Sequence, residues 1–221
     1  MMKIVNLLLV IFLFNLIAVS VSAQLTKGST WLGGSANYSS NVSEAPFSSR
    51  TKTQSFNISP AIGKVVKPGL VTGIEFLYSS AKEERNNPSY ENKNKFYGAG
   101  IFARKYIETF KKLYLFGHAG LGGGINRANT SNNFPGVTES NGWQAGVSLY
   151  PGISYALSSK VFLEAAFINL FMVNYSSTKT KIQNDVYKNS NFSASVNFNN
   201  ASNFGLGIRF ILPGGSSKKT N

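Results

Sequence analysis

The residue types that could carry chemistry in this 221-residue sequence are few, and the first of them is a single histidine. His118 could act as a general base if a serine and a carboxylate were arranged around it. The nearest serine and carboxylate in the sequence do not flank it, so we expect an internal, hydrogen-bonded imidazole and no catalytic residue. One histidine, scattered carboxylates and no cysteine also give no pattern typical of a metal or cofactor site.

A glycine run is the second candidate, because glycine-rich loops can hold phosphate groups. No Gly-Lys-Ser/Thr triplet follows this run, which lies inside an expected strand instead of before a helix. We therefore expect small residues that fit the crowded interior of a narrow barrel. The glycines concerned are Gly117, Gly120, Gly122, Gly123 and Gly124.

Charged residues within apolar stretches are the third candidate. They are Glu75, Arg104, Glu164 and Arg209. If their side of each stretch faces an interior, they must pair, because unpaired buried charge is costly. Glu164 and Arg209 lie at matching height on neighbouring expected strands, so we expect these two to form an ion pair.

The elements that must position these residues are strands, because apolar residues recur at every second position. In the stretch from Trp143 to Leu157, odd-numbered residues form a mostly apolar set and even-numbered residues a mostly small or polar set. Seven other stretches alternate in the same way, which predicts an all-β protein with eight strands. The predicted strands are Thr30–Tyr38, Ser55–Lys64, Leu70–Ser79, Phe96–Ile107, Leu113–Ile125, Trp143–Leu157, Val161–Tyr175 and Asn203–Leu212.

The connections between these stretches alternate between long and short, which predicts an antiparallel up-and-down meander with four long loops at one end. Ser39–Thr53 and Ser80–Lys95 are two of the long polar stretches. The short turns lie at residues 65–69, 108–112 and 158–160.

The placement of aromatic residues indicates that the apolar face points outward, toward lipid. Six aromatic residues share the apolar face and lie beside the long connections, as in the aromatic belt of a membrane protein. They are Tyr38, Phe56, Tyr78, Tyr97, Trp143 and Tyr175. Strands of about ten residues also match the roughly 25 Å apolar band of a transmembrane barrel better than soluble strands do. A soluble lipocalin-like barrel or a β-sandwich would alternate too, with the apolar face inward.

The expected fold is therefore a transmembrane eight-stranded antiparallel β-barrel, with ten strands as the alternative. Phe192, Ala194 and Val196 continue the alternation of the last strand, which extends it or adds a hairpin. The stretch Thr180–Lys188 is too polar to span lipid comfortably, which favours eight.

Three segments organise the chain. Residues 1–23 have a lysine, an apolar stretch and a Val21-Ser22-Ala23 end, as in a cleaved signal peptide. Residues 24–212 form the barrel, and residues 213–221 read as a flexible periplasmic tail.

On these features the chain resembles the small outer-membrane β-barrel family of the OmpX/OmpA type, also called the porin-like outer membrane protein β-barrel domain. The terminal strand carries part of this resemblance, because its alternating apolar residues end in an aromatic, like the signal read by the barrel-assembly machinery. The residues concerned are Phe204, Leu206, Ile208 and Phe210. The family usually ends at this aromatic, whereas this chain continues to Asn221.

The resemblance implies a monomeric, non-enzymatic protein of the Gram-negative outer membrane, with no cofactor and a role in adhesion or envelope integrity. A narrow porin and a lipid A-modifying enzyme are the alternatives. The expected partners are outer-membrane lipids, the assembly machinery and an unidentified surface ligand. The net charge of +13 does not indicate nucleic-acid binding, because the cations form no stripe with stacking aromatics. Several lie near the short turns, where we expect contact with anionic headgroups or cell-wall polymer.

Overall fold

The computed structural model describes residues 25–44, 50–86, 89–132, 137–168, 170–182, 185–197 and 204–214. The predicted signal peptide, residues 1–23, lies outside the described residues, as do residues 215–221 of the predicted tail. Within the described ranges, no helix has the length and apolar character needed to cross a membrane.

All regular structure in these ranges is β-strand. The strands are β1 (Thr30–Ser43), β2 (Thr51–Lys67), β3 (Leu70–Asn86), β4 (Ser89–Phe110), β5 (Leu113–Asn132), β6 (Val137–Ala156), β7 (Val161–Phe167), β8 (Phe171–Ile182), β9 (Asp185–Val196) and β10 (Phe204–Leu212).

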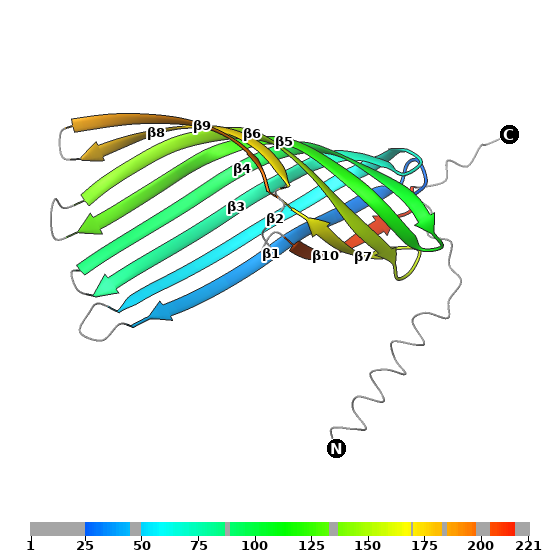
Figure 1. Ribbon diagram of the computed structural model, residues 1–221, viewed down its shortest axis with the longest axis horizontal. Coiled ribbons are helices and arrows are strands. Elements are labelled where there is room, and N and C mark those ends of the chain that lie inside the picture. The colour runs from blue at the N-terminus through cyan, green and yellow to red at the C-terminus, as the bar shows by residue number, and fades with distance from the viewer. Residues whose placement is uncertain are drawn as a thin grey trace, which may run out of the picture.

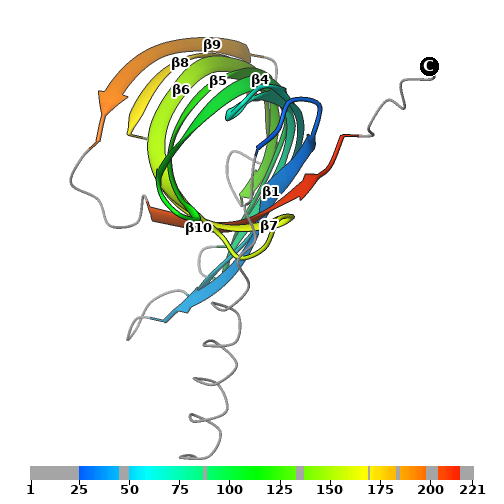
Figure 2. The ribbon, with the colours of Figure 1, turned by 90° about the vertical axis from the view of Figure 1, so that its right-hand side faces the viewer.

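The strands form one antiparallel sheet that closes into a ring through eight of them (Figure 2). The ring runs from β1 to β6 in sequence order, continues to β7 and β10, and returns to β1. The prediction of an all-β, eight-stranded antiparallel ring is therefore confirmed, and β8 and β9 do not enlarge the ring.

The predicted seventh strand, Val161–Tyr175, is divided into β7 and β8, whereas the predicted eighth strand, Asn203–Leu212, corresponds to β10 alone. β6 pairs with β7 over Gly152–Ala156 and with β8 over Thr138–Leu149, so β7 and β8 follow one another along the same neighbour. β9 pairs with β8, and β10 pairs with β7. β10 and β9 thus lie along β7 and β8, which occupy the place of an extended seventh strand.

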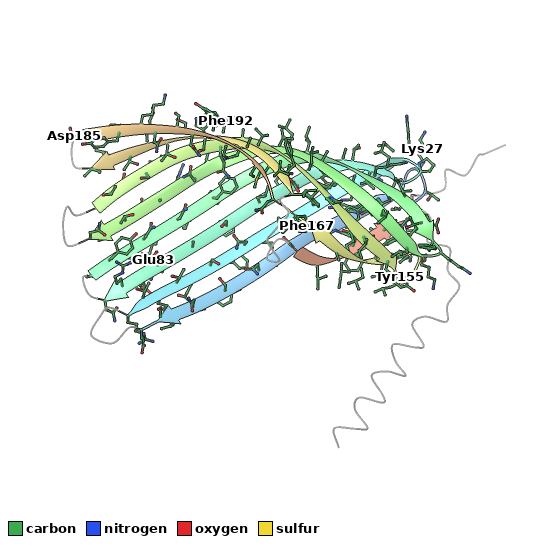
Figure 3. The ribbon with its side chains drawn as sticks, in the orientation of Figure 1. Lys27, Glu83, Tyr155, Phe167, Asp185 and Phe192 are labelled. Carbon is green, nitrogen blue, oxygen red and sulfur yellow. The ribbon has the colours of Figure 1, made fainter. Side chains whose placement is uncertain are left out.

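The two ends of the ring differ, and the strands run obliquely between them (Figure 1). At one end of the ring, which we call distal, consecutive strands are connected by residues 44–50, 87–88, 133–136 and 183–184. At the end we call proximal, the turns lie at residues 68–69, 111–112 and 157–160. In Figure 3 the labelled Glu83 and Asp185 mark the distal end, and Lys27 and Tyr155 mark the proximal end.

The predicted long distal loops are wrong, because most of their residues are strand. Residues 39–43 pair with residues 51–55, and Asn86 pairs with Ser89 at the end of a long β3–β4 hairpin. The apolar alternation ends before the hydrogen-bonded pairing does. Sequence patterning reports which faces are apolar, and strand ends that are polar on both faces leave no such signal.

The sheet has free edges at the distal end. β1 pairs with β10 only over Thr30–Leu32, and within the described ranges the rest of β1 pairs with β2 alone. Likewise β9 pairs with β8 alone in the part of the chain that the structure covers. Among the described residues, the ring is therefore closed at the proximal end, and the rest of β1 forms one side of an unpaired seam toward the distal end.

The core fills the proximal half of the ring. Its buried side chains are mostly large and, apart from Leu25, which precedes β1, come from all eight ring strands. Sequence reasoning expected glycines and paired ions in the interior, whereas bulky aromatic and aliphatic residues fill this half. The cluster comprises Leu25, Trp31, Val65, Val71, Phe102, Tyr106, Tyr114, Phe116, Ala156, Phe162 and Ile211.

The outer face of the ring is apolar and exposed. Ile101, Leu121 and Ile153 are each about half exposed, while inward residues on the same three strands are buried. A water-soluble barrel keeps its apolar side chains in the core and a polar outer face, whereas this ring is apolar on the outer face as well.

Candidate functional site

The most distinctive polar feature of the ring interior is a buried ion pair. Arg104 on β4 and Glu164 on β7 point inward from strands on different sides of the ring, and each residue is 2% exposed. The Arg104 Nη1 atom lies 2.7 Å from Glu164 Oε2. A charge-assisted bond this short offsets part of the cost of burying both groups.

Arg209 on β10 forms a second ion pair with the same carboxylate. Its Nε lies 3.0 Å from Glu164 Oε2, so the residues that the sequence pairs are in contact. Arg209 Nη1 also donates to the carbonyl oxygen of Gly34 at 2.9 Å. That carbonyl lies just above the last residue pair between β1 and β10, so Arg209 satisfies an acceptor at the start of the open seam.

Two glycines make room for the Arg209 side chain. A Cβ added to Gly33 would lie 2.7 Å from Arg209 Cδ, and one added to Gly207 would lie 2.8 Å from its Nη1. Such distances are too short for carbon atoms without displacement of the side chain. The position of this guanidinium therefore depends on glycine at both neighbouring inward positions.

Hydroxyl groups complete the partners of the ion pair. The Tyr106 hydroxyl donates to Glu164 Oε1 at 2.6 Å and accepts a hydrogen bond from Trp31 Nε1 at 3.0 Å. Arg104 Nη2 donates to the Tyr150 hydroxyl at 3.1 Å. Both carboxylate oxygens of Glu164 thus have partners, which is the condition for a stable buried charge network.

His118 belongs to this network. Its ring stacks between Tyr150, with centroids 4.3 Å apart, and Phe102, at 5.5 Å. Arg104 Nε donates to His118 Nδ1 at 3.3 Å. Because arginine only donates, Nδ1 must act as the acceptor, and that nitrogen cannot at the same time take a substrate proton.

Glu75 is the fourth predicted charge, and the structure does not bring it into an ion pair. It points into the same cavity of about 280 Å³ that Arg104, Glu164 and Arg209 line. Within the described ranges, the salt bridges of the interior are the two on Glu164. Three of the four predicted charges therefore form one network, and the fourth, Glu75, lies beside it.

The interior offers no built metal site. Within the described residues, no three histidine, cysteine, aspartate or glutamate side chains gather closely enough to hold an ion. The network can hold charge, donate hydrogen bonds and fix the relative positions of six strands, β1, β4, β5, β6, β7 and β10.

Sequence reasoning missed the aromatic members of the network. Tyr106 shares the inward phase of Arg104 on β4, and Trp31 and Tyr150 line the interior from β1 and β6. An aromatic on the polar side of an alternating strand was the available signal. The glycine prediction was wrong for Gly117 and Gly123, which share the outward phase of Leu121.

The six predicted belt aromatics all lie on the outer face. Five are between 40% and 65% exposed, and the partly buried Tyr78 packs between Phe56 and Tyr97. We call this set the girdle: Tyr38, Phe56, Tyr78, Tyr97, Trp143 and Tyr175. On the terminal strand β10, Leu206 is 82% exposed, and Ile208 and Phe210 are also exposed on the outer face. The Phe204 side chain lies outside what the structure describes.

The similarity of this chain to known proteins lies in its architecture. No protein-family model and no curated protein matches the chain. Among solved structures, the chain is similar to a major outer membrane protein from Thermus thermophilus, with 8% identity and a TM-score of 0.44 over 83% of this chain and 99% of that one. It is also similar to Neisserial surface protein A (NspA), with 21% identity and a TM-score of 0.33 over 83% of this chain and 96% of that one. The likeness to both outer membrane proteins is one of fold alone.

Proposed function

We propose that this chain is an integral outer-membrane β-barrel protein with a filled interior and a structural or interaction role, in adhesion or envelope integrity. The observation that carries the proposal is the apolar, exposed outer face of the ring around an interior that holds buried charges. Charged residues are buried inside, while large apolar residues are exposed on the outside of the ring. Such an exposed surface is stable in hydrocarbon and is an aggregation hazard in water.

The distal hairpins are the parts that would meet the outside of the cell. Their strands extend beyond the girdle and are polar, which suits a surface exposed to water. The exposed apolar residues of β10 would pair with the assembly machinery during insertion, by addition of a strand to a sheet edge.

Heat-modifiable migration on a gel tests this proposal. The unboiled, detergent-solubilised protein should run faster than the boiled sample, because a closed ring of hydrogen-bonded strands resists unfolding by the gel detergent. A folded monomer that remains soluble in water without detergent would overturn the proposal.

The cavity of about 280 Å³ beside the ion-pair network favours a narrow porin as the second candidate. We nevertheless expect no steady conductance in planar bilayers, because Trp31, Phe102 and Phe116 fill the proximal half of the ring. Single-channel recording of the purified protein, with boiled protein as the control, makes the measurement. Reproducible conductance steps would favour the porin.

An enzymatic role has no comparable support. The Nδ1 atom of His118 is occupied by Arg104, so the residue lacks the free base that a lipid-modifying enzyme would need. We expect lipid A mass spectra to be unchanged between cells with and without the gene.

A further inference from the structure

The outer face of the ring carries a set of cations just beyond the girdle. On β2, β3, β4, β5, β8 and β9, a lysine or an arginine is the first charged outward-facing residue on the distal side of an outward-facing aromatic or aliphatic residue, which is Phe56, Tyr78, Tyr97, Ile125, Tyr175 or Phe192. On β9 the exposed Val186 lies beyond this lysine. We call these residues the basic collar: Lys52, Lys82, Lys95, Arg127, Lys179 and Lys188.

The distance between collar and girdle suits a lipid headgroup. Lys95 is two residues beyond Tyr97 on β4, and Lys179 is four residues beyond Tyr175 on β8. These intervals correspond to about 7 and 13 Å along a strand. On β9, Lys188 lies between Phe192 and Asp185, which Figure 3 labels on the outer side and at the distal tip. Long cationic side chains at such positions reach the phosphate level of a bilayer.

Four collar residues stand as like-charged pairs on neighbouring strands. Lys95 lies directly opposite Arg127, and Lys179 lies directly opposite Lys188. Asn141 on β6 lies directly opposite both Arg127 and Lys179, so this uncharged residue separates the two pairs. Like charges directly opposite each other in a sheet destabilise it, so each pair gains from an anion between its members.

No acidic side chain of the protein supplies that anion. All nine acidic residues lie in the described ranges, and none is within 4 Å of these four cations. By contrast, Lys82, the collar residue of β3, and the nearby Lys93 of β4 both form ion pairs with Glu91.

We propose that these two cation pairs bind the phosphate groups of an anionic lipid whose acyl chains lie along the apolar wall below them. The inference rests on the proposed membrane insertion. It goes further by assigning a lipid class to one part of the outer face. Arginine and lysine bind phosphate by charge-assisted hydrogen bonds, and the apolar face with its girdle holds the chains.

The two tryptophans provide a local readout. Trp143 is exposed in the girdle, two residues from Asn141 and on the same face of β6, whereas Trp31 is 2% exposed inside the ring. Lipids with brominated acyl chains quench tryptophan on contact, so they should report on Trp143. The full chain is reconstituted with brominated phosphatidylglycerol or with brominated phosphatidylcholine, and quenching is compared at equal lipid ratios.

We expect phosphatidylglycerol to be preferred at Trp143 in the wild type. The variants Lys95→Gln/Arg127→Gln and Lys179→Gln/Lys188→Gln should each weaken this preference by up to roughly 30-fold, at about 1 kcal/mol for each cation near an anionic surface. The matched control is Lys93→Gln/Lys181→Gln, which removes two cations from β4 and β8 that face Glu91 and Glu139. The control should change the preference less than threefold.

Each other outcome is informative. Equal preference in the wild type and both pair variants, all with wild-type heat-modifiable migration, would overturn the lipid assignment. Inorganic phosphate that abolishes the preference at the lipid's own concentration would show a site for free anions instead of lipid. An acidic protein segment that binds the wild type but not the pair variants, with no lipid preference, would replace lipid by protein. If neither brominated lipid quenches Trp143, membrane insertion fails, and the proposed function fails with it.

Discussion

At the scale of residues, the interior is organised around one carboxylate that two arginines share. Removing Arg209 leaves Glu164 paired with Arg104, whereas removing Glu164 leaves the buried Arg104 and the partly buried Arg209 without their shared carboxylate. The sequence identified the Glu164–Arg209 contact, because alternation fixes the face of a residue and strand order fixes its neighbour. It did not identify Arg104 as a partner, because contacts across a ring depend on its diameter and on the packed aromatics, which alternation does not encode.

Because two arginines share the Glu164 carboxylate, we expect their variants to have non-additive effects on the free energy of unfolding in lipid vesicles. Glu164→Ala should lower the free energy of unfolding by about 3–5 kcal/mol, because it leaves buried charge uncompensated. Arg209→Ala should cost less, and the double variant should cost less than the sum of the two by about 0.5–3 kcal/mol. Urea titrations followed by gel migration measure all three.

The control for this cycle is Glu108→Ala, which removes an exposed carboxylate near a proximal turn. It should change the unfolding free energy by less than about 0.5 kcal/mol. Strictly additive losses for Glu164→Ala and Arg209→Ala would mean that the two side chains do not interact in the folded protein.

At the scale of elements, the proximal ends of the strands follow the sequence closely and the distal ends do not. Leu70 and Leu113 begin their strands as predicted, because a short turn ends the apolar pattern there. At the distal end of β4, Ser89–Lys95 pairs with β3 although no apolar face marks it. Apolar alternation therefore locates the part of a strand that has one apolar face. Beyond that part, the length of the hydrogen-bonded pairing in water is set by the partner strand.

Two glycines on neighbouring strands test which face points inward. A Cβ on Gly152 would lie 2.3 Å from Phe116 Cζ inside the ring, whereas a Cβ on Gly117 would meet nothing within 4 Å outside it. Gly152→Val should therefore destabilise the barrel by about 1–3 kcal/mol through overpacking. Gly117→Val should be neutral or slightly stabilising, because valine favours strands.

Urea unfolding of both variants in the same vesicles makes the comparison, and each variant serves as the control for the other. The reverse order of stability would mean that the apolar face is the packed interior, as in a soluble barrel.

At the scale of the whole molecule, the ring is asymmetric along its axis. The proximal half is closed and filled, and the distal half consists of long hairpins with a seam beside β1. The predicted ring was accessible from sequence, because closing the sheet pairs strand edges that hydrocarbon would otherwise leave unsatisfied. The seam was not, because it depends on how far β10 follows β1, and the alternation of the two strands is compatible with full pairing.

The absence of cysteine allows a direct test of which end faces the outside of the cell. Ser89 is exposed at the distal tip of β4, and Ser159 is exposed in a proximal turn. In intact cells, a membrane-impermeant maleimide should label Ser89→Cys and leave Ser159→Cys unlabelled, because only the distal hairpins would lie outside the outer membrane. Permeabilised cells, in which both variants should be labelled equally, control for reactivity. Labelling of Ser159→Cys alone in intact cells would invert the orientation, and with it the leaflet whose phosphates the basic collar would meet.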